Sequence, residues 1–232
     1  MLLTGLLFGL GCKDTGTNPD KNLTVNQQAA IQYFKDIALG FEFGNALEVT
    51  RKWSSDIRIL VAGEPGNVLL NELDDILNDL NNLISDSALK LSLTDESADS
   101  NMFLFFGEGE EFEQLDNRAT NLVDSNFGLF FVRFNSLNYI TSASIYVDTV
   151  RPTEIQQRHL LREELTQALG LAKDSALFQD SIFRESFAGV DTEYNRFDEA
   201  IIQMLYHPKM STGLDADAVD PILREIVTEV IE

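Results

Sequence analysis

The sequence predicts a layered α+β domain, on three observations. Its 232 residues suit one globular domain with a sizeable core. Hydrophobic residues make up 44% of the chain and charged residues 24%, as in ordinary folded proteins. Amphipathic helical segments lie towards both ends of the chain and several strand-like segments lie between them, a distribution typical of α+β folds.

The first elements are a helix and a strand. Thr24 and Gln27 have the spacing of a capping box, which predicts a helix with apolar residues on one face as far as Ala38. The apolar run 57–62 predicts a strand that ends in the turn 63–66. This turn is too short for a phosphate-binding loop and has no Lys-Ser/Thr, so nucleotide binding is not expected.

The segment 68–84 has the periodicity of an amphipathic helix. Its leucines and isoleucines are expected to face the core, and Glu72, Asp75 and Asp79 to face solvent. Strands are expected over 89–93, 102–106, 127–134 and 140–147, with an acidic loop or short helix over 108–115. Helices are expected over 153–169 and 197–206, with an irregular stretch over 174–193 between them. A last helix is expected to start at Asp220-Pro221, with Asp220 as its N-cap.

The strong negative charge limits the classes of partner. The chain has 17 basic and 38 acidic residues, a net charge of −21. Such a surface repels phosphate backbones and anionic lipid headgroups. We therefore expect no nucleic-acid partner.

The single cysteine, Cys12, follows a short apolar run that ends in glycine. This arrangement resembles the end of a bacterial lipoprotein signal peptide, although Gly9 stands where a leucine is usual and no basic residue precedes the run. The resemblance implies a signal segment over 1–12, a linker over 13–23 and one domain over 24–232. It also implies a protein of the bacterial cell envelope, periplasmic or surface-exposed, that is anchored to the membrane by a lipid on Cys12. The alternative is an incidental cysteine near the terminus.

The helix expected over 153–169 has clear signals at both ends. Thr153 and Gln156 have capping-box spacing, and Gly170 suits the left-handed residue that ends a helix. Glu164 falls inside the apolar arc of this helix. A carboxylate on an apolar face must be paired, protonated or functional.

The end of this helix resembles the metzincin-type motif of zincin metallopeptidases, His-Glu-x-x-His-x-x-Gly-x-x-His. In those enzymes the histidines bind zinc, the Glu is the general base for zinc-bound water, and the glycine turns the chain. Glu164 matches the general base and Gly170 the turning glycine. The three histidine positions hold Glu163, Gln167 and Lys173. The spacing is kept while the zinc ligands are lost, which favours a non-catalytic domain.

Residues 163–171, Asp174-Ser175, 180–183 and 205–214 resemble domain-of-unknown-function family 2927, which comprises bacterial secreted proteins and lipoproteins. His207 stands where this family would have an aspartate. The resemblance runs over most of the chain. It implies a zincin-like fold with a mixed, mostly antiparallel sheet packed by long helices, and a loop-rich helical C-terminal part.

A metal site is still conceivable on the same helix. His159 and Glu163 are four residues apart on one ridge, and an imidazole nitrogen and a carboxylate oxygen both suit zinc. A third donor would have to come from His207 or Asp215. Each histidine also has a plainer interpretation, His159 as a helix residue beside Glu163 and His207 as a residue at a helix end. Met210 is another residue near such a site, although plain packing is the simpler expectation.

Glu164 has further interpretations that involve no metal. It can be a buried carboxylate that pairs with an arginine, for which Arg151, Arg184 and Arg196 are candidates. The oxygens of Asp174, Asp180 and Ser181 could serve calcium, but they lack the spacing of a calcium-binding loop, so loop capping is the better interpretation.

Two functions from different classes remain. The first is a zincin-like domain without catalysis and without a cofactor, which binds a protein or peptide in its cleft or acts as a scaffold. The second is an atypical hydrolase that uses zinc or another divalent metal on His159 and Glu163, with Glu164 as general base.

Overall fold

The computed structural model describes residues 23–41, 46–185 and 191–232. The elements in chain order are α1 (Val25–Ala38), β1 (Lys52–Trp53), β2 (Ile57–Gly63), α2 (Gly66–Leu83), the 3₁₀ turn η2 (Ser85–Ser87), β3 (Leu91–Leu93), β4 (Met102–Gly107), α3 (Gly109–Leu115), the 3₁₀ turn η3 (Asn117–Ala119), β5 (Gly128–Phe134), β6 (Tyr139–Asp148), α4 (Glu154–Gln167), α5 (Arg196–Tyr206) and α6 (Ala216–Val230). Helices and one mixed sheet are therefore both present, as the sequence predicts.

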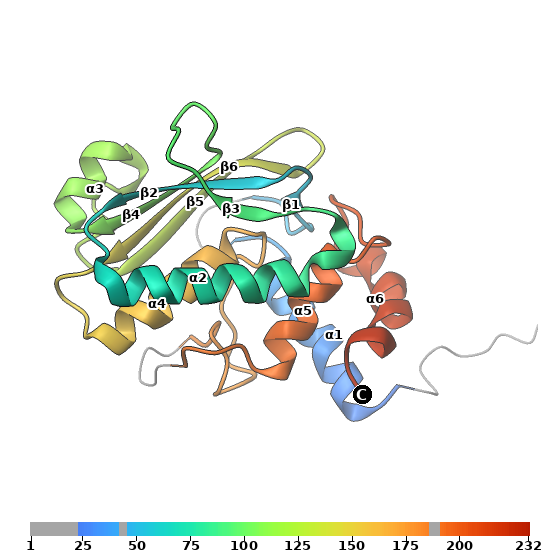
Figure 1. The fold of residues 1–232 in the computed structure, drawn as a ribbon. Helices are drawn as coiled ribbons and strands as arrows, with labels where there is room; N and C mark the ends of the chain where they lie inside the picture. Colours follow the sequence, from blue (N-terminus) through green and yellow to red (C-terminus); the bar gives the residue numbers. More distant parts are fainter. Residues whose placement is uncertain (1–22, 42–45, 186–190) are drawn as a thin grey trace, which may run out of the picture.

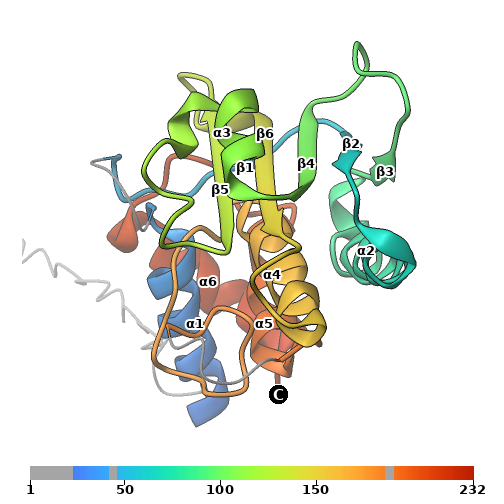
Figure 2. The ribbon, with the colours of Figure 1, turned by 90° about the vertical axis from the view of Figure 1, so that its left-hand side faces the viewer.

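The sheet has six strands with helices on both faces. Figure 1 shows α2 and α4 below the sheet, with α1, α5 and α6 beside them. Figure 2 shows the strands side by side in the order β5, β6, β4, β2 and β3, with β1 next to the start of β6. Among the described strands, β5 therefore lies at an edge of the sheet.

The strand directions differ from the prediction. β2 pairs in parallel with β3 and β4, and β6 pairs in parallel with β1 and β4. Among the described strands, β5 alone runs antiparallel, against β6. The expectation of a mostly antiparallel sheet was wrong because β3 and β4 lie on opposite sides of β2. The segment 94–101 therefore crosses over β2 and does not form a hairpin.

Apolar side chains on the two faces of the sheet form two cores. The larger core lies between the sheet and helices α1, α2, α4, α5 and α6. The smaller core lies under α3, where Phe112 packs against Phe105, Leu129 and Tyr146. Residues in β5 alternate between these cores, so that Phe130 faces the α4 side and Leu129 the α3 side.

Helix α6 begins five residues earlier than the sequence predicts. Asp215 is its N-cap and accepts a hydrogen bond from the backbone N–H of Ala218 at 2.9 Å. Pro221 therefore lies inside the helix, and Asp220, the expected N-cap, instead forms an ion pair with Lys35. Asp215 already caps the helix. The missing N–H of Pro221 therefore costs the helix one hydrogen bond but does not end the helix.

No helix within the described ranges is long and apolar enough to span a bilayer. The predicted signal segment, Cys12 and most of the predicted linker lie outside these ranges.

Candidate functional site

Helix α4 lies under the sheet, and both of its ends are fixed. At the start, the Gln156 side chain accepts a hydrogen bond from the backbone N–H of Thr153 at 2.9 Å, as the capping box predicts. At the end, Gly170 has a φ of +114°, and a Cβ built there would lie 2.1 Å from the carbonyl oxygen of Arg51. Both the positive φ and this close approach require glycine.

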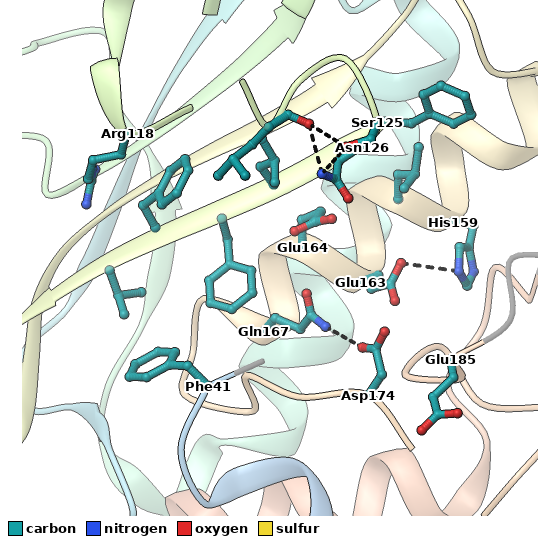
Figure 3. A pocket seen from close by; sticks show the side chains of 18 of the residues that line it. Phe41, Arg118, Ser125, Asn126, His159, Glu163, Glu164, Gln167, Asp174 and Glu185 are labelled. Atoms are coloured by element: carbon teal, nitrogen blue, oxygen red, sulfur yellow. Dashed lines mark hydrogen bonds and ion pairs between the residues drawn. The ribbon is translucent and has the colours of Figure 1, made fainter. Parts of the chain in front are cut away.

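The side of α4 that contains Glu163 and Glu164 borders a groove of about 730 Å³. The groove runs along β5, because every residue from Phe127 to Val132 lines it. The other walls come from the loop before β5, the loop after α4, and Phe41. Figure 3 shows Glu164 beneath β5, with Glu163 and Gln167 on the same helix. The predicted site residues of α4 therefore lie together in one groove.

Glu164 contacts the backbone of β5. A Cβ built at Gly128 would lie 2.3 Å from Glu164 Oε1 and 2.8 Å from its Cγ. The carboxylate therefore occupies the space that a side chain at position 128 would fill. Glu164 is 7% exposed, which confirms that a carboxylate lies buried on this helix. The close approach of strand and carboxylate makes Gly128 part of the site.

His159 and Glu163 form a pair in the groove. His159 Nε2 lies 3.4 Å from Glu163 Oε2, and His159 Nδ1 lies 2.7 Å from the carbonyl oxygen of Asp191. Burial lowers the pKa of His159, but the hydrogen bond and the negative charge of Glu163 outweigh burial and raise the pKa above its usual value. The pair therefore favours a charged imidazole that donates from both nitrogens.

The residues that follow along the groove also bind one another. Gln167 Nε2 donates to Asp174 Oδ1 at 2.9 Å, which joins α4 to the loop after it (Figure 3). Arg184, from the same loop, lies 3.4 Å from Asp191 and donates to the carbonyl of Gln179. Its Nε and Nη2 are buried without an acceptor among the described residues. Lys173 pairs with Glu48, with its Nζ 3.2 Å from a carboxylate oxygen.

The remaining residues considered as metal ligands lie elsewhere. His207 ends α5, with its Nε2 3.4 Å from Glu229, and Asp215 caps α6. Met210 is 2% exposed and its carbonyl accepts a hydrogen bond from Lys52. Neither His207 nor Asp215 is among the described residues that line the groove. Three or more His, Cys, Asp or Glu side chains do not come together as a metal-binding group anywhere in residues 23–41, 46–185 and 191–232.

The three arginines proposed as partners for Glu164 bind other groups. Arg151 forms an ion pair with Asp148. Arg184 binds Asp191, as described, and Arg196 donates to Asn26 at 3.1 Å.

Asp180 and Ser181, which the sequence offered as oxygen ligands, hold the loop after α4 in place. Asp180 accepts a hydrogen bond from the side chain of Asn195 at 3.2 Å, and Ser181 donates to Asp198 at 2.7 Å. Asp198 is fully buried and also accepts from the Tyr33 hydroxyl at 2.9 Å. Burial raises the pKa of Asp198 to about 6, although its hydrogen bonds act in the opposite direction. This cluster supports the loop that borders the groove.

The opposite side of α4 carries an ion network. Arg162 is 1% exposed and lies 3.1 Å from Glu72 and 2.8 Å from Asp79, both on α2. Arg158 also reaches Glu72, at 2.6 Å. The prediction that Glu72 faces solvent was wrong, because α4 covers that side of α2 and supplies two guanidinium groups. These ion pairs attach helix α4 to helix α2.

Two groove residues escaped the sequence interpretation. Gly128 stands at the start of a phenylalanine-rich strand, and an isolated glycine in a strand is a known signal for close approach by another group. Phe41 follows a helix end and gave no periodic signal. It stacks on Phe134 with ring centroids 6.0 Å apart, at the far end of β5. Only the fold brings Phe41 to the groove.

A search of the curated proteins found no match to this chain. The family model described as a protein of unknown function, DUF2927, matches residues 27–225. This range covers the groove, helix α4 and most of the sheet and helices. The chain belongs to the DUF2927 family of proteins of unknown function.

Proposed function

We propose that this protein is a cell-envelope lipoprotein whose zincin-like domain binds an extended segment of another protein and does not catalyse a reaction. The observation that carries the proposal is the groove between α4 and the edge strand β5. In a zincin-like domain this groove would correspond to the cleft beside the motif helix.

The open side of β5 suits an extended polypeptide. The N–H of Asp148 donates to the carbonyl of Phe127, so β5 residues at alternate positions from 127 onward bond to β6. By the same alternation, Gly128, Phe130 and Val132 direct their N–H and C=O groups away from β6, at the edge where no other described strand pairs. A row of backbone donors and acceptors of this kind binds an added strand, with pockets for alternate side chains.

The residues at the motif positions support binding over catalysis. Glu163 is engaged with His159, and Gln167 with Asp174. A zincin would direct metal-binding nitrogens into the cleft from positions 163 and 167, whereas here the carboxylate and the amide are each engaged by a neighbouring side chain. Such a groove presents fixed polar groups to a ligand.

The envelope location rests on the lipoprotein-like segment before and including Cys12. A lipid on this cysteine, followed by the polar linker 13–23, would hold the binding domain close to a membrane surface. Expression of the full chain in a bacterial host, followed by mass spectrometry of the N-terminal peptide, tests this point. A diacylglyceryl adduct that is lost in Cys12→Ser is the expected result, and an unmodified Cys12 would contradict it.

Peptide binding tests the function itself. Extended peptides of about eight residues should bind the purified domain, and copies with N-methyl groups on alternate amides should not, because N-methylation removes the hydrogen bonds of an added strand. Equal binding of both peptide types would overturn strand addition. Metal analysis of protein purified without chelator should give no stoichiometric zinc, iron, manganese or calcium.

The second candidate function is an atypical metal-dependent hydrolase. The observation that favours it is that His159 and Glu163 lie 3.4 Å apart in the groove that Glu164 also lines. His159 and Glu163 would be the metal ligands and Glu164 the general base. Stoichiometric metal, together with peptide hydrolysis that Glu164→Gln abolishes while the melting temperature is kept, would establish this function in place of the first.

A further inference from the structure

Two stacked phenylalanines lie at one end of the groove. Phe41 and Phe134 both line it, with ring centroids 6.0 Å apart and ring planes 14° from parallel. Figure 3 shows Phe41 at the end of the groove opposite His159. Phe134 is the last residue of β5 and is 40% exposed, so the pair leaves apolar surface open to a ligand. This end of the groove therefore fits an apolar side chain.

Arg51 lies against both rings and has no acidic partner within the described ranges. Its guanidinium carbon lies 5.1 Å from the Phe41 centroid and 4.4 Å from the Phe134 centroid. Its Nη1 donates to the carbonyl oxygens of Leu47 and Val49, at 2.9 Å and 3.1 Å, while its Nε has no acceptor in this part of the chain. The residue is 3% exposed, and this burial lowers the pKa of Arg51.

A buried cation of this kind attracts an anion. Buried charges in proteins are usually paired, and the carboxylate three residues before Arg51, Glu48, is bound to Lys173 instead. The ring faces attract the guanidinium, but they carry no net charge that could neutralise it. Arg51 is not among the residues that line the groove, so its charge acts from behind the rings. An anion placed against the rings would supply the missing charge, and burial limits the screening between the two.

The regular edge of β5 also stops at this end of the groove. The register between β5 and β6 shifts between Arg133 and Phe134. Such an irregularity bends a strand and interrupts its pairing. A segment added to the edge of β5 would therefore pair along residues 128–132 and reach Phe134 with its last residue. The site suits the end of a chain better than its middle.

A carboxyl terminus is the chain end that fits beside Arg51. An amino terminus carries an ammonium group, which the guanidinium repels, whereas a carboxyl terminus carries a carboxylate, which the guanidinium attracts. A last side chain that packs on the two rings brings its own carboxylate close to them. A segment in this orientation runs parallel to β5, because β5 itself ends at Phe134.

We infer that the groove binds the carboxyl terminus of an extended partner protein whose last residue is apolar. The segment pairs with the edge of β5, packs its last side chain against Phe41 and Phe134, and places its terminal carboxylate within the field of Arg51. This inference rests on the proposed function and adds the kind of segment that the groove selects. A second copy of this chain is a poor occupant, because two molecules of net charge −21 repel each other.

Labelled peptides of about eight residues, read by fluorescence anisotropy, test the inference. The parent peptide alternates valine and serine, ends in phenylalanine with a free carboxylate, and carries the dye at its amino terminus. One matched peptide has a C-terminal amide, one has serine as its last residue, and one has N-methyl groups on alternate amides.

The proteins are the wild type, Arg51→Met, Arg51→Gln and the control Arg133→Met. Arg51→Gln removes the charge but keeps an N–H donor for the carbonyls of Leu47 and Val49, so it serves if Arg51→Met does not fold. Arg133 is exposed, precedes Phe134 and is not among the residues that line the groove. The control therefore removes the same charge at a neighbouring position.

The wild type should bind the peptide acid at least about tenfold more tightly than the peptide amide. This preference should fall to about twofold or less in both Arg51 variants and persist in Arg133→Met, because exposed charges contribute little. Replacement of the last phenylalanine by serine should weaken binding to the wild type by about tenfold or more, because the apolar contact is lost.

Equal binding of acid and amide by the wild type would overturn the inference, and this comparison does not depend on the folding of any variant. A preference that survives in a folded Arg51 variant would also overturn it, as would a dimer, seen by sedimentation, that excludes the peptide. Failure of the proposed function is distinct, since the N-methylated peptide would then bind as well as the parent. Absence of binding by every peptide would overturn both.

Discussion

The two sides of helix α4 use buried charge in different ways. On the side towards α2, Arg162 lies against Glu72 and Asp79, so opposite charges neutralise each other inside the fold. On the side towards β5, Glu163 and Glu164 face a groove together with a histidine and amide groups. The first side joins two helices through opposite charges, whereas the second side borders a groove along the edge of the sheet. Helix α4 thus supports the packing of the fold on one side and, under the proposed function, forms part of a binding groove on the other.

The largest loss of stability is expected when Arg162, on the α2 side of helix α4, is replaced by an apolar residue. Arg162→Leu leaves Glu72 buried, with Arg158 as its remaining guanidinium partner. We expect the free energy of unfolding to fall by about 3 kcal/mol, because an uncompensated buried charge is expensive. Urea unfolding followed by circular dichroism measures this loss.

The double variant Arg162→Leu/Glu72→Leu provides the control. Removal of both charges should cost clearly less than the sum of the two single substitutions, because the partners interact directly. Strict additivity would show that the network has no coupling and would remove the contrast between the two sides of α4.

Asp198 extends the comparison to a buried carboxylate that has only neutral donors. Its pKa is raised to about 6 by burial, so between about pH 4 and pH 6 the folded protein holds a proton that the unfolded chain releases. The contribution of Asp198 to the free energy of unfolding should therefore fall as pH rises through this window, by an amount on the order of 3 kcal/mol.

The measurement is urea unfolding from pH 4 to pH 7 for the wild type and Asp198→Asn. The stability of the wild type minus that of the variant should decrease with rising pH across the window and become constant above it. A difference that increases with pH would mean that the hydrogen bonds accepted by Asp198 outweigh its burial.

Gly128 allows the groove side to be disturbed through packing alone. Gly128→Val adds a side chain where Glu164 Oε1 now lies, 2.3 Å from the new Cβ. We expect a loss of about 1–3 kcal/mol, the usual cost of overpacking. Differential scanning fluorimetry detects this as a lower melting temperature. Glu164→Ala in the same chain should restore part of the loss, and an unchanged melting temperature in the single variant would contradict the close approach.

The smallest change in stability is expected when the charge of Glu163, on the groove side of helix α4, is removed. Glu163→Gln should change stability by less than about 1 kcal/mol, because the imidazole can release its proton when the carboxylate is removed and a neutral hydrogen bond then replaces the ion pair. The pKa of His159 should fall, since burial then acts without the charge of Glu163. An NMR titration of the imidazole follows this change, and a pKa that stays raised would assign the shift to another group.

The local signals in the sequence predicted local structure well. Thr24 and Thr153 open helices as capping boxes, and Gly170 ends α4. The burial of Glu164 also followed from helical periodicity alone. These features depend on residues within a few positions of each other, so the sequence contains the information directly.

Features that depend on distant residues were not predictable in this way. Glu72 is buried because Arg162, 90 positions later, approaches it. The parallel pairing of β2 with β4 depends on a crossover, which no local pattern records. Gly128 gave a usable signal, but its meaning depends on Glu164, which reaches it only in the folded sheet.

The close approach at Gly170 has a consequence for mutational tolerance. The backbone carbonyls just before it accept hydrogen bonds from Trp53 and Tyr206, so the end of α4 is fixed to β1 and α5. No other residue suits a φ of +114° and a carbonyl 2.1 Å from the new Cβ. Position 170 should therefore lose cellular abundance and ligand binding together in a saturation mutagenesis experiment. Position 163 should lose binding while abundance is kept, which separates selection for the fold from selection for the groove.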